Sequence, residues 1–301
     1  MLQRTQTEKW LGVLGNLRVD RKKTIAPHKP LLLLVVAELA EQGALTETTL
    51  PLTGELVFRF LAFATIVAER RPQRPDIRLP FYHLKSEGCW TPLDEDGRPA
   101  TDRTRAVAAR INDEFFACLY DQSFRLLMRR SLIARYFVDP RERTALYELV
   151  GIQVPPDDVV REDAQLYISD RGRGREARFR LTVVPAYNYT CALTGYRLTT
   201  TKSGSIVDAA HIHRFSDSRN NHPQNGIALC KNAHWLFDQG LWSLTDQHEV
   251  IVAKERFDES GEGHFLLSRM EKRVAFLPSD PAYWPDKSHL RWHREHVFNR
   301  F

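Results

Sequence analysis

Three polar residues set at short intervals in the C-terminal half constrain the fold of this chain most. His211 lies in a stretch of small and β-branched residues (207–212), Asn225 stands before a glycine, and His234 lies in a largely apolar segment (227–239) that ends at a glycine. The first stretch predicts a β-strand, Asn225 is typical of a turn or a helix start, and the third segment predicts a helix. The sequence therefore predicts a strand with one histidine, a loop with the asparagine, and a helix with the other histidine.

The side chains in these elements have the chemistry of a hydrolytic site. Because side chains alternate along a strand, Asp208 and Ala210 share one face and His211 lies on the other. His234 and Asp238 are four residues apart on the predicted helix, so they share a face and could present a nitrogen and a carboxylate to one cation. A neutral histidine is a suitable general base near pH 7, and a bound metal steadies the charge on a scissile phosphate. These residues therefore fit metal-assisted cleavage of a phosphodiester.

This segment, together with residues 189–195 before it, resembles the HNH nuclease family. The resemblance implies an α+β chain whose C-terminal domain, residues 169–301, is a ββα-metal nuclease. It implies that His211 is the general base, that Asn225 orients the base or the metal loop, and that His234 takes part in catalysis. It also implies a divalent metal cofactor, namely Mg²⁺, Mn²⁺ or Co²⁺.

The chain departs from the family at one metal-ligand position. Many HNH nucleases carry an acidic ligand immediately before the base, where this chain has Ala210. Asp208, two residues earlier on the same strand face, is the nearest substitute. The metal ligands that the resemblance implies are therefore Asp208, His234 and Asp238.

The four cysteines argue against a structural zinc site. Some HNH proteins hold zinc with paired Cys-x-x-Cys motifs, and this chain has no such pair. In the nuclease fold we expect Cys191 and Cys230 to approach each other as packed thiols. No hydrophobic export segment is recognisable at the N-terminus, so we expect a cytoplasmic protein with reduced thiols.

The N-terminal part predicts a separate, mainly helical domain. The run at residues 31–36 is apolar on all sides, which predicts a buried central helix. Residues 81–84 and Trp90 predict short strands, and the prolines and aspartates at 155–158 are typical of a linker. We therefore expect a recognition domain at 1–150, a linker at 151–168 and a nuclease domain at 169–301.

The chain is mildly basic, with a net charge of +5. A basic balance suits a polyanion such as DNA but does not identify one. Arginines are concentrated just after the predicted linker, where they form either a solvated helix face or contacts to backbone phosphates. These residues are Arg171, Arg173, Arg175, Arg178 and Arg180.

The N-terminal part has a resemblance of its own, carried by residues 26–34, 79–84 and 88–90. It resembles the DNA sulfur-binding domain found upstream of HNH domains in modification-dependent restriction endonucleases. The resemblance implies recognition of phosphorothioate DNA, in which sulfur replaces a non-bridging phosphate oxygen, by an apolar cup around Pro80. The DNA-binding residues that it implies are His28, Lys29, Leu79, Pro80, His83 and Arg105.

Such a cup can prefer sulfur because sulfur is larger, softer and less well hydrated than oxygen. A phosphate oxygen placed there would lose water without gaining a hydrogen-bond donor, while cationic groups at the rim would meet the remaining charge. Two positions depart from the family, since Leu79 replaces a usual aromatic residue and His83 a usual small one. The bulk of His83 would narrow the cup or change the flanking DNA sequence that it prefers.

The expected function is that of a metal-dependent endonuclease that recognises modified, phosphorothioated double-stranded DNA and cuts nearby, as in restriction. Two alternatives stay open. The N-terminal domain could read methylated, hydroxymethylated or unmodified DNA, or the chain could be a zinc-stabilised DNA-binding regulator that does not cut. No stretch is long and apolar enough to predict a membrane span. The sequence leaves the oligomeric state open, with a homodimer as one option.

Overall fold

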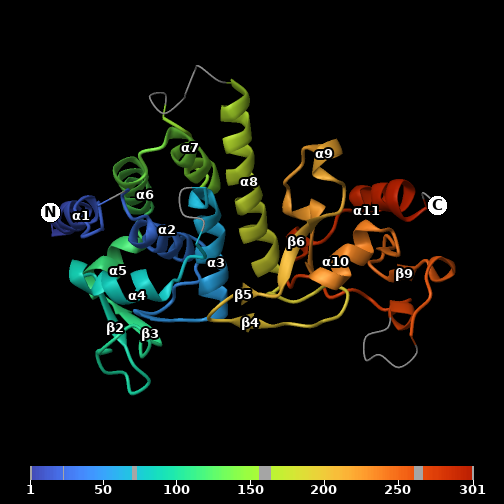
Figure 1. Cartoon of the computed structure of the whole chain (residues 1–301), viewed down its shortest axis with the longest axis horizontal. Helices are drawn as coiled ribbons and strands as arrows, with labels where there is room; N and C mark the ends of the chain where they lie inside the picture. Colours follow the sequence, from blue (N-terminus) through green and yellow to red (C-terminus); the bar gives the residue numbers. More distant parts are fainter. Residues whose placement is uncertain (1, 23, 70–72, 156–163, 261–266, 300–301) are drawn as a thin grey trace. The chain divides into compact units, whose positions relative to one another are not determined.

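The computed structural model describes residues 2–22, 24–69, 73–155, 164–260 and 267–299. By its internal contacts the chain divides into two units, Met1–Arg178 and Phe179–Phe301 (Figure 1). Both units combine helices with small antiparallel sheets, so the prediction of an α+β chain is confirmed. Within the described ranges, no helix combines the length and the apolar character that a membrane crossing requires.

The first unit is mainly helical, as predicted. Its elements in chain order are α1 (Leu2–Gly15), α2 (His28–Glu41), β1 (Thr49–Pro51), α3 (Gly54–Ala64), η1 (Thr65–Val67), α4 (Arg78–His83), η2 (Leu84–Glu87), β2 (Trp90–Leu93), β3 (Ala108–Ile111), α5 (Asp113–Leu119), α6 (Gln122–Tyr136) and α7 (Pro140–Leu149).

Helix α2 forms the centre of the first unit. Every side chain from Leu31 to Ala37 is fully buried, and helices α3, α4 and α6 pack against α2. Full burial of each leucine or valine contributes roughly 1.5–3 kcal/mol, so this helix is a major source of the unit's stability. The prediction of a buried central helix is confirmed.

The prediction of a strand at residues 81–84 is wrong, because these residues belong to helix α4 and the 3-10 turn η2. The buried side chains of Ile77, Phe81 and Leu84 recur at the i, i+4, i+7 spacing of one helix face. Pro80 lies in the first turn of α4, where its missing N–H has no intrahelical partner to lose. Helical periodicity therefore prevails over the strand preference of the aromatic residues.

A small antiparallel sheet supports α4. Its strand order is β1-β3-β2, and the prediction of a strand at Trp90 is confirmed because β2 begins there. The indole Nε1 of Trp90 donates to the Phe81 carbonyl oxygen at 2.7 Å, and the two rings meet edge to face. This contact fixes the position of α4, and with it the residues around Pro80.

Helix α8 (Ala164–Ala186) begins inside the segment 151–168 that was expected to be a linker. Residues 156–163, with most of the proline- and aspartate-rich motif, lie outside the described residues. The boundary between the two units falls within α8 rather than near residue 150. The reason is close packing of α8 on α7, since a Cβ at Gly174 would come within 2.2 Å of the Ala145 carbonyl oxygen.

The second unit contains short strands and helices. After the end of α8 they are β4 (Thr199–Thr200), β5 (Gly204–Ser205), β6 (Val207–His211), α9 (Phe215–Ser218), η4 (Pro223–Asn225), β7 (Gly226–Cys230), α10 (Lys231–Asp238), β8 (Trp242–Leu244), β9 (Val250–Val252), η5 (Lys254–Arg256), η6 (Leu267–Met270), η7 (Pro281–Tyr283), α11 (Lys287–His293) and the π-helical turn η8 (Arg294–Phe298).

Strands β6 and β7 pair antiparallel and carry the first histidine of the motif, with His211 opposite Gly226. The strand predicted at residues 207–212 is confirmed. The prediction of a helix from residue 227 is wrong for residues 227–230, which form β7, and helix α10 begins only after them. A short, fully buried apolar run suits either a strand or a helix, and pairing with β6 decides for the strand.

Helix α10 is seated on the core by its apolar face. Phe237 stacks on His293 of α11 with the ring centroids 3.7 Å apart, and the Ala233 carbonyl accepts from Trp242 Nε1 at 3.0 Å. Burial lowers the pKa of His293 to about 3, so this histidine is neutral at pH 7, and its Nδ1 lies 2.8 Å from Ser243 Oγ. The buried imidazole therefore has a structural role in holding α10 in place.

Candidate active site and binding pocket

His211 lies at the end of β6, within a cage of aromatic and amide side chains. Its ring stacks on Phe179 of α8 with centroids 4.0 Å apart and planes 6° apart, and Phe215 packs at 5.5 Å. His211 Nε2 lies 2.8 Å from Asn221 Oδ1. The residue opposite, Gly226, allows this close approach of α8, because a Cβ there would lie 2.8 Å from the Phe179 ring.

The contact between His211 and Asn221 sets the chemistry of the imidazole. An amide oxygen accepts, so the bond to Asn221 would place the proton on Nε2 and the basic lone pair on Nδ1. Stacking on Phe179 fixes the plane of the ring. Phe179 and Asn221 were not predicted from the sequence, because each reaches His211 from outside the motif that contains this histidine. An oriented neutral imidazole of this kind can act as a general base.

Asn225 is fully buried and holds the loop between β6 and β7 together. Its Oδ1 accepts from the His213 amide at 2.8 Å, and its Nδ2 donates to the carbonyl oxygens of His213 and Asn220 at 2.9 Å each. Its own carbonyl accepts from the Ile212 amide at 2.9 Å. Asn225 therefore positions the loop that follows His211 and supplies Asn221.

We expect Asn225→Ala to lower the free energy of unfolding by about 1–3 kcal/mol, because it removes the hydrogen bonds that the fully buried Asn225 side chain makes to the backbone of His213 and Asn220. Urea denaturation of the full chain would measure this loss. The matched control is Asn232→Ala, since Asn232 is exposed on α10 and its removal should leave stability within about 0.5 kcal/mol. Equal unfolding midpoints for both variants would contradict the conclusion that the Asn225 side chain stabilises the loop between β6 and β7.

The three expected metal ligands do not form one group. Asp208 Oδ1 accepts from Arg180 Nε at 2.6 Å, which engages this carboxylate in an ion pair. His234 Nε2 lies 3.5 Å from Asp238 Oδ2, so the expected sharing of a helix face is confirmed for this pair. Across the described ranges, no three His, Cys, Asp or Glu side chains are grouped so as to hold a metal. Of the three expected ligands, the described residues therefore bring only His234 and Asp238 together.

The arginine run at the start of α8 is largely engaged in ion pairs. Arg171 and Arg175 both pair with Glu148, and Arg173 pairs with Glu69 at 2.9 Å. These contacts lie within the first unit and support the interpretation of the run as a helix surface.

Cys191 and Cys230 are both free thiols and lie in contact, as predicted. The hydrogen bond from the Cys230 thiol lowers the pKa of Cys191, and the same contact raises the pKa of Cys230. The pair packs the turn at residues 191–195 against the end of β7.

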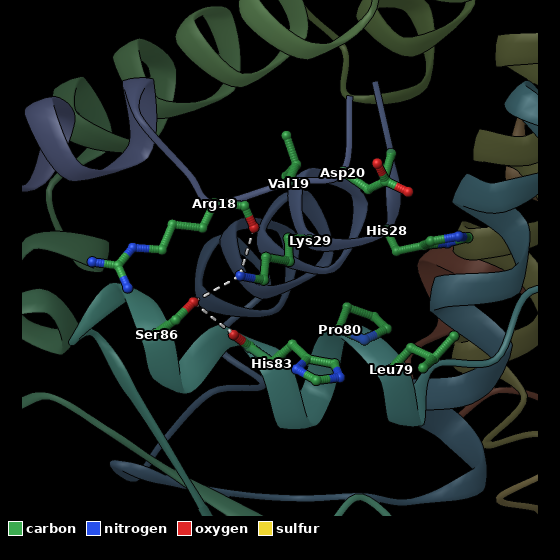
Figure 2. A pocket seen from close by; sticks show the side chains of 10 residues that line it. Arg18, Val19, Asp20, His28, Lys29, Leu79, Pro80, His83 and Ser86 are labelled. Atoms are coloured by element: carbon green, nitrogen blue, oxygen red, sulfur yellow. Dashed lines mark hydrogen bonds between the residues drawn. The ribbon is translucent and has the colours of Figure 1, made fainter. Parts of the chain in front are cut away.

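The first unit contains a cavity of about 340 Å³ around Pro80 (Figure 2). Segments far apart in the sequence build it: the chain after α1, the start of α2, and the helical stretch α4–η2. It is lined by Arg18, Val19, Asp20, Ala26, His28, Lys29, Leu79, Pro80, His83 and Ser86.

The lining combines apolar and polar groups. Val19, Ala26, Leu79 and Pro80 supply apolar surface. Burial lowers the pKa of His83, and the nearby cations Lys29, Lys85 and Arg103 lower it further, so His83 is neutral at pH 7. The cavity therefore offers an apolar wall beside uncharged imidazole.

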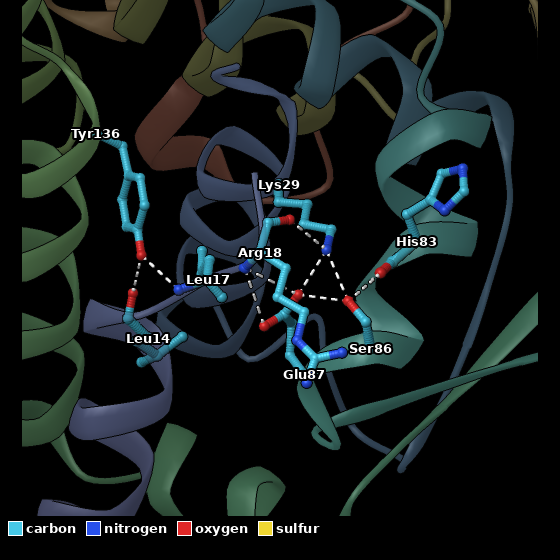
Figure 3. Close-up of polar contacts among 8 residues, drawn as sticks. All are labelled: Leu14, Leu17, Arg18, Lys29, His83, Ser86, Glu87 and Tyr136. Carbon is cyan, nitrogen blue, oxygen red and sulfur yellow. Dashed lines mark hydrogen bonds and ion pairs between the residues drawn. The ribbon is translucent and has the colours of Figure 1, made fainter. Parts of the chain in front are cut away.

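Lys29 belongs to the wall of this cavity rather than to a free rim. Its Nζ donates to the Arg18 carbonyl and to Ser86 Oγ at 2.9 Å each, and to Glu87 Oε1 at 2.5 Å (Figure 3). The side chains of Lys29 and Glu87 are only 10% and 4% exposed, so the pair is buried. Its main effect is to tie the segment after α1 to η2. Arg105 is highly exposed and is not among the lining residues.

The segment after α1 has a second anchor in Figure 3. The Tyr136 hydroxyl accepts from the Leu17 amide at 2.7 Å and donates to the Leu14 carbonyl at 2.8 Å. Together with the Lys29–Glu87 pair, it holds the chain from which Val19 reaches the cavity.

The aromatic residues that would favour a base-reading pocket lie elsewhere. Phe81 and Trp90 are buried against each other, and the Tyr82 hydroxyl donates to the Thr101 carbonyl. None of these three rings lines the cavity.

Residues 191–245 match a family model described as HNH endonuclease. The match confirms the prediction that the C-terminal part carries an HNH nuclease domain. A solved structure titled "Modification dependent TagI restriction endonuclease" is similar at 23% sequence identity and a TM-score of 0.31, over 40% of this chain and 38% of that one. The similar part is thus well under half of that protein. No curated protein matches the chain.

Proposed function

We propose that this chain is a DNA endonuclease that reads phosphorothioate-modified DNA through the cavity of the first unit and cuts the DNA nearby with the HNH domain. The observation that carries the proposal is the convergence of His28, Lys29, Leu79, Pro80 and His83 on one cavity. These residues come from separate segments of the sequence. Chain folding brings them together around an apolar wall at the position where the sulfur cup is expected.

The composition of the cavity suits a sulfur atom better than a phosphate oxygen. Val19, Ala26, Leu79 and Pro80 offer no hydrogen-bond donor from their side chains, so an oxygen placed against them would lose hydration without compensation. Sulfur is less strongly hydrated and gains dispersion contacts with the same groups. The preference therefore arises from the cost of burying oxygen.

In the proposed cutting step, His211 takes a proton from the attacking water. The bond between Nε2 and Asn221 and the stack on Phe179 orient the imidazole for this step. HNH nucleases generally use a divalent metal ion. Because the described side chains do not gather into a full ligand set, the pair His234 and Asp238 is proposed only as a place where a metal binds.

Cleavage of two matched duplexes tests the proposal. One duplex carries phosphorothioates of both stereochemistries in several sequence contexts, and the other has ordinary phosphates throughout. We expect the full chain to cut the modified duplex with Mg²⁺, Mn²⁺ or Co²⁺ and to stop cutting when a chelator is added. Equal cutting of both duplexes would refute the sulfur preference, and cutting that persists in chelator would refute the metal requirement.

A metal titration tests the proposed ligands. We expect His234→Ala to raise the metal concentration needed for half-maximal cutting by about 10-fold or more, because loss of a ligating group weakens the site. Asp208→Asn should raise it as well if Asp208 leaves Arg180 to bind the metal. The control is Asp217→Asn, an exposed carboxylate on α9. Unchanged titrations for both test variants would place the metal on other residues.

A further inference from the structure

Helix α10 presents a solvent face that carries more than the second histidine of the motif. Ala233 and Phe237, one turn apart, are buried against the core. On the opposite side, Lys231 and Trp235 are exposed and one turn apart, so they share a face. His234, three residues after Lys231, lies at the edge of this face. This face therefore combines a cation, an indole and an imidazole within two turns.

Trp235 is unusual among the tryptophans of the chain. It is 60% exposed, whereas Trp90 and Trp242 are buried and donate their indole N–H groups to backbone carbonyls. The Trp235 indole has no hydrogen bond and no ring stack with any side chain in the described ranges. Single exposed apolar side chains are common, so the inference depends on the place of Trp235, which shares helix α10 with His234 and a helix face with Lys231.

We propose that Trp235 stacks on a nucleotide of the bound DNA strand beside the point of cleavage and holds that strand against the HNH site. The inference rests on the proposed function. Aromatic side chains stack on any base, since every base has a π-face, and a neighbouring cation can meet the backbone phosphate. Lys231 supplies that cation from the same face, while the carboxylate of Asp238 lies against His234.

A nucleic acid strand fits this face better than an apolar protein segment does. The exposed part of α10 places one large apolar ring among polar and charged side chains. A base with its phosphate needs one ring and one cation, and both are present. The same DNA strand that contacts this face would also extend into the HNH site, where it is cut.

The test compares Trp235→Ala and Trp235→Phe with wild type, using Tyr196→Ala as a control from another exposed aromatic residue in the same unit. Once the cleavage position is mapped, 5-iodouracil is placed at each nucleotide around it, and the full chain is photocrosslinked in chelator. Mass spectrometry then locates the crosslinked residue. Steady-state cutting gives KM and kcat for each variant.

We expect a crosslink to Trp235 in the wild type and none at residue 235 in Trp235→Ala. Trp235→Ala should raise KM about 10-fold with little change in kcat, because the ring contributes to binding and not to the chemical step. Trp235→Phe should have a KM between those of Trp235→Ala and the wild type, and Tyr196→Ala should have the wild-type KM. Equal KM values and an unchanged crosslink pattern in Trp235→Ala would overturn the inference while the nuclease assignment stands. A wild type that cuts no duplex with any of the metals would overturn both.

Discussion

The His211→Ala protein should cut DNA roughly 10²- to 10⁴-fold more slowly than the wild type while it folds and binds DNA normally. This range is the usual contribution of a positioned general base. His211 lies at the end of β6, where its ring is fixed by Phe179 and oriented by Asn221. Alanine keeps the strand pairing with Gly226, so the loss should be confined to the chemical step.

Single-turnover cleavage at saturating enzyme and metal measures this loss, and DNA binding in chelator measures what is retained. The cleavage rate of Asn221→Ala should lie between those of wild type and His211→Ala, about 10-fold below wild type. This variant keeps the base but removes the hydrogen bond that orients its ring. His222→Gln is the control, since His222 is an exposed histidine in the same loop. A His211→Ala protein that cuts at the wild-type rate would remove His211 from the mechanism.

The parts of the fold that were predictable are those in which one local signal dominates. The apolar run at 31–36 follows Pro30, which suits a helix start, and the segment continues to Gly43, which is longer than a typical strand, so a buried helix is favoured, and α2 is one. Around His211, β-branched flanks and small residues predicted a strand, and β6 is that strand. In both places, local preference and tertiary burial favour the same structure.

The errors occurred where a short apolar run suits two structures. Residues 227–229 are all buried, so periodicity could not separate a strand from the helix that follows, and only pairing with β6 does so. Residues 81–84 contain aromatic residues that favour strands, yet Phe81 and Leu84 lie on one buried helix face. Both outcomes depend on contacts with residues distant in the sequence.

The sites show the same limit. Spacing singled out His211, Asn225 and His234 as candidates but could not find Phe179, which reaches His211 from helix α8. For Lys29 the sequence predicted a rim cation, whereas the structure pairs it with Glu87 inside the wall. Such pairings depend on which distant segments meet, and no local pattern records them.

Pro80→Asp should abolish the preference for phosphorothioate DNA, weakening binding of the modified duplex by about 100-fold. A carboxylate in the cavity would face the negatively charged phosphorothioate, and an apposition of like charges costs several kcal/mol. Because Pro80 is buried in the first turn of α4, circular dichroism of Pro80→Asp must match that of the wild type for the comparison to count. Pro80→Ala keeps an apolar surface at this position and is the matched control, expected to retain most of the preference.

Salt dependence separates the cavity from ordinary phosphate contacts. Raising the ionic strength weakens backbone contacts on both duplexes alike, so total affinity should fall steeply for each. Contact between sulfur and Pro80 is apolar and is not screened, so the ratio of the two affinities should stay nearly constant in the wild type. Arg105→Ala removes an exposed cation outside the cavity, so it should lower the affinity for both duplexes and leave the ratio of the two affinities unchanged. A ratio that falls to one as salt rises would show that charge, and not the apolar wall, distinguishes the two DNAs.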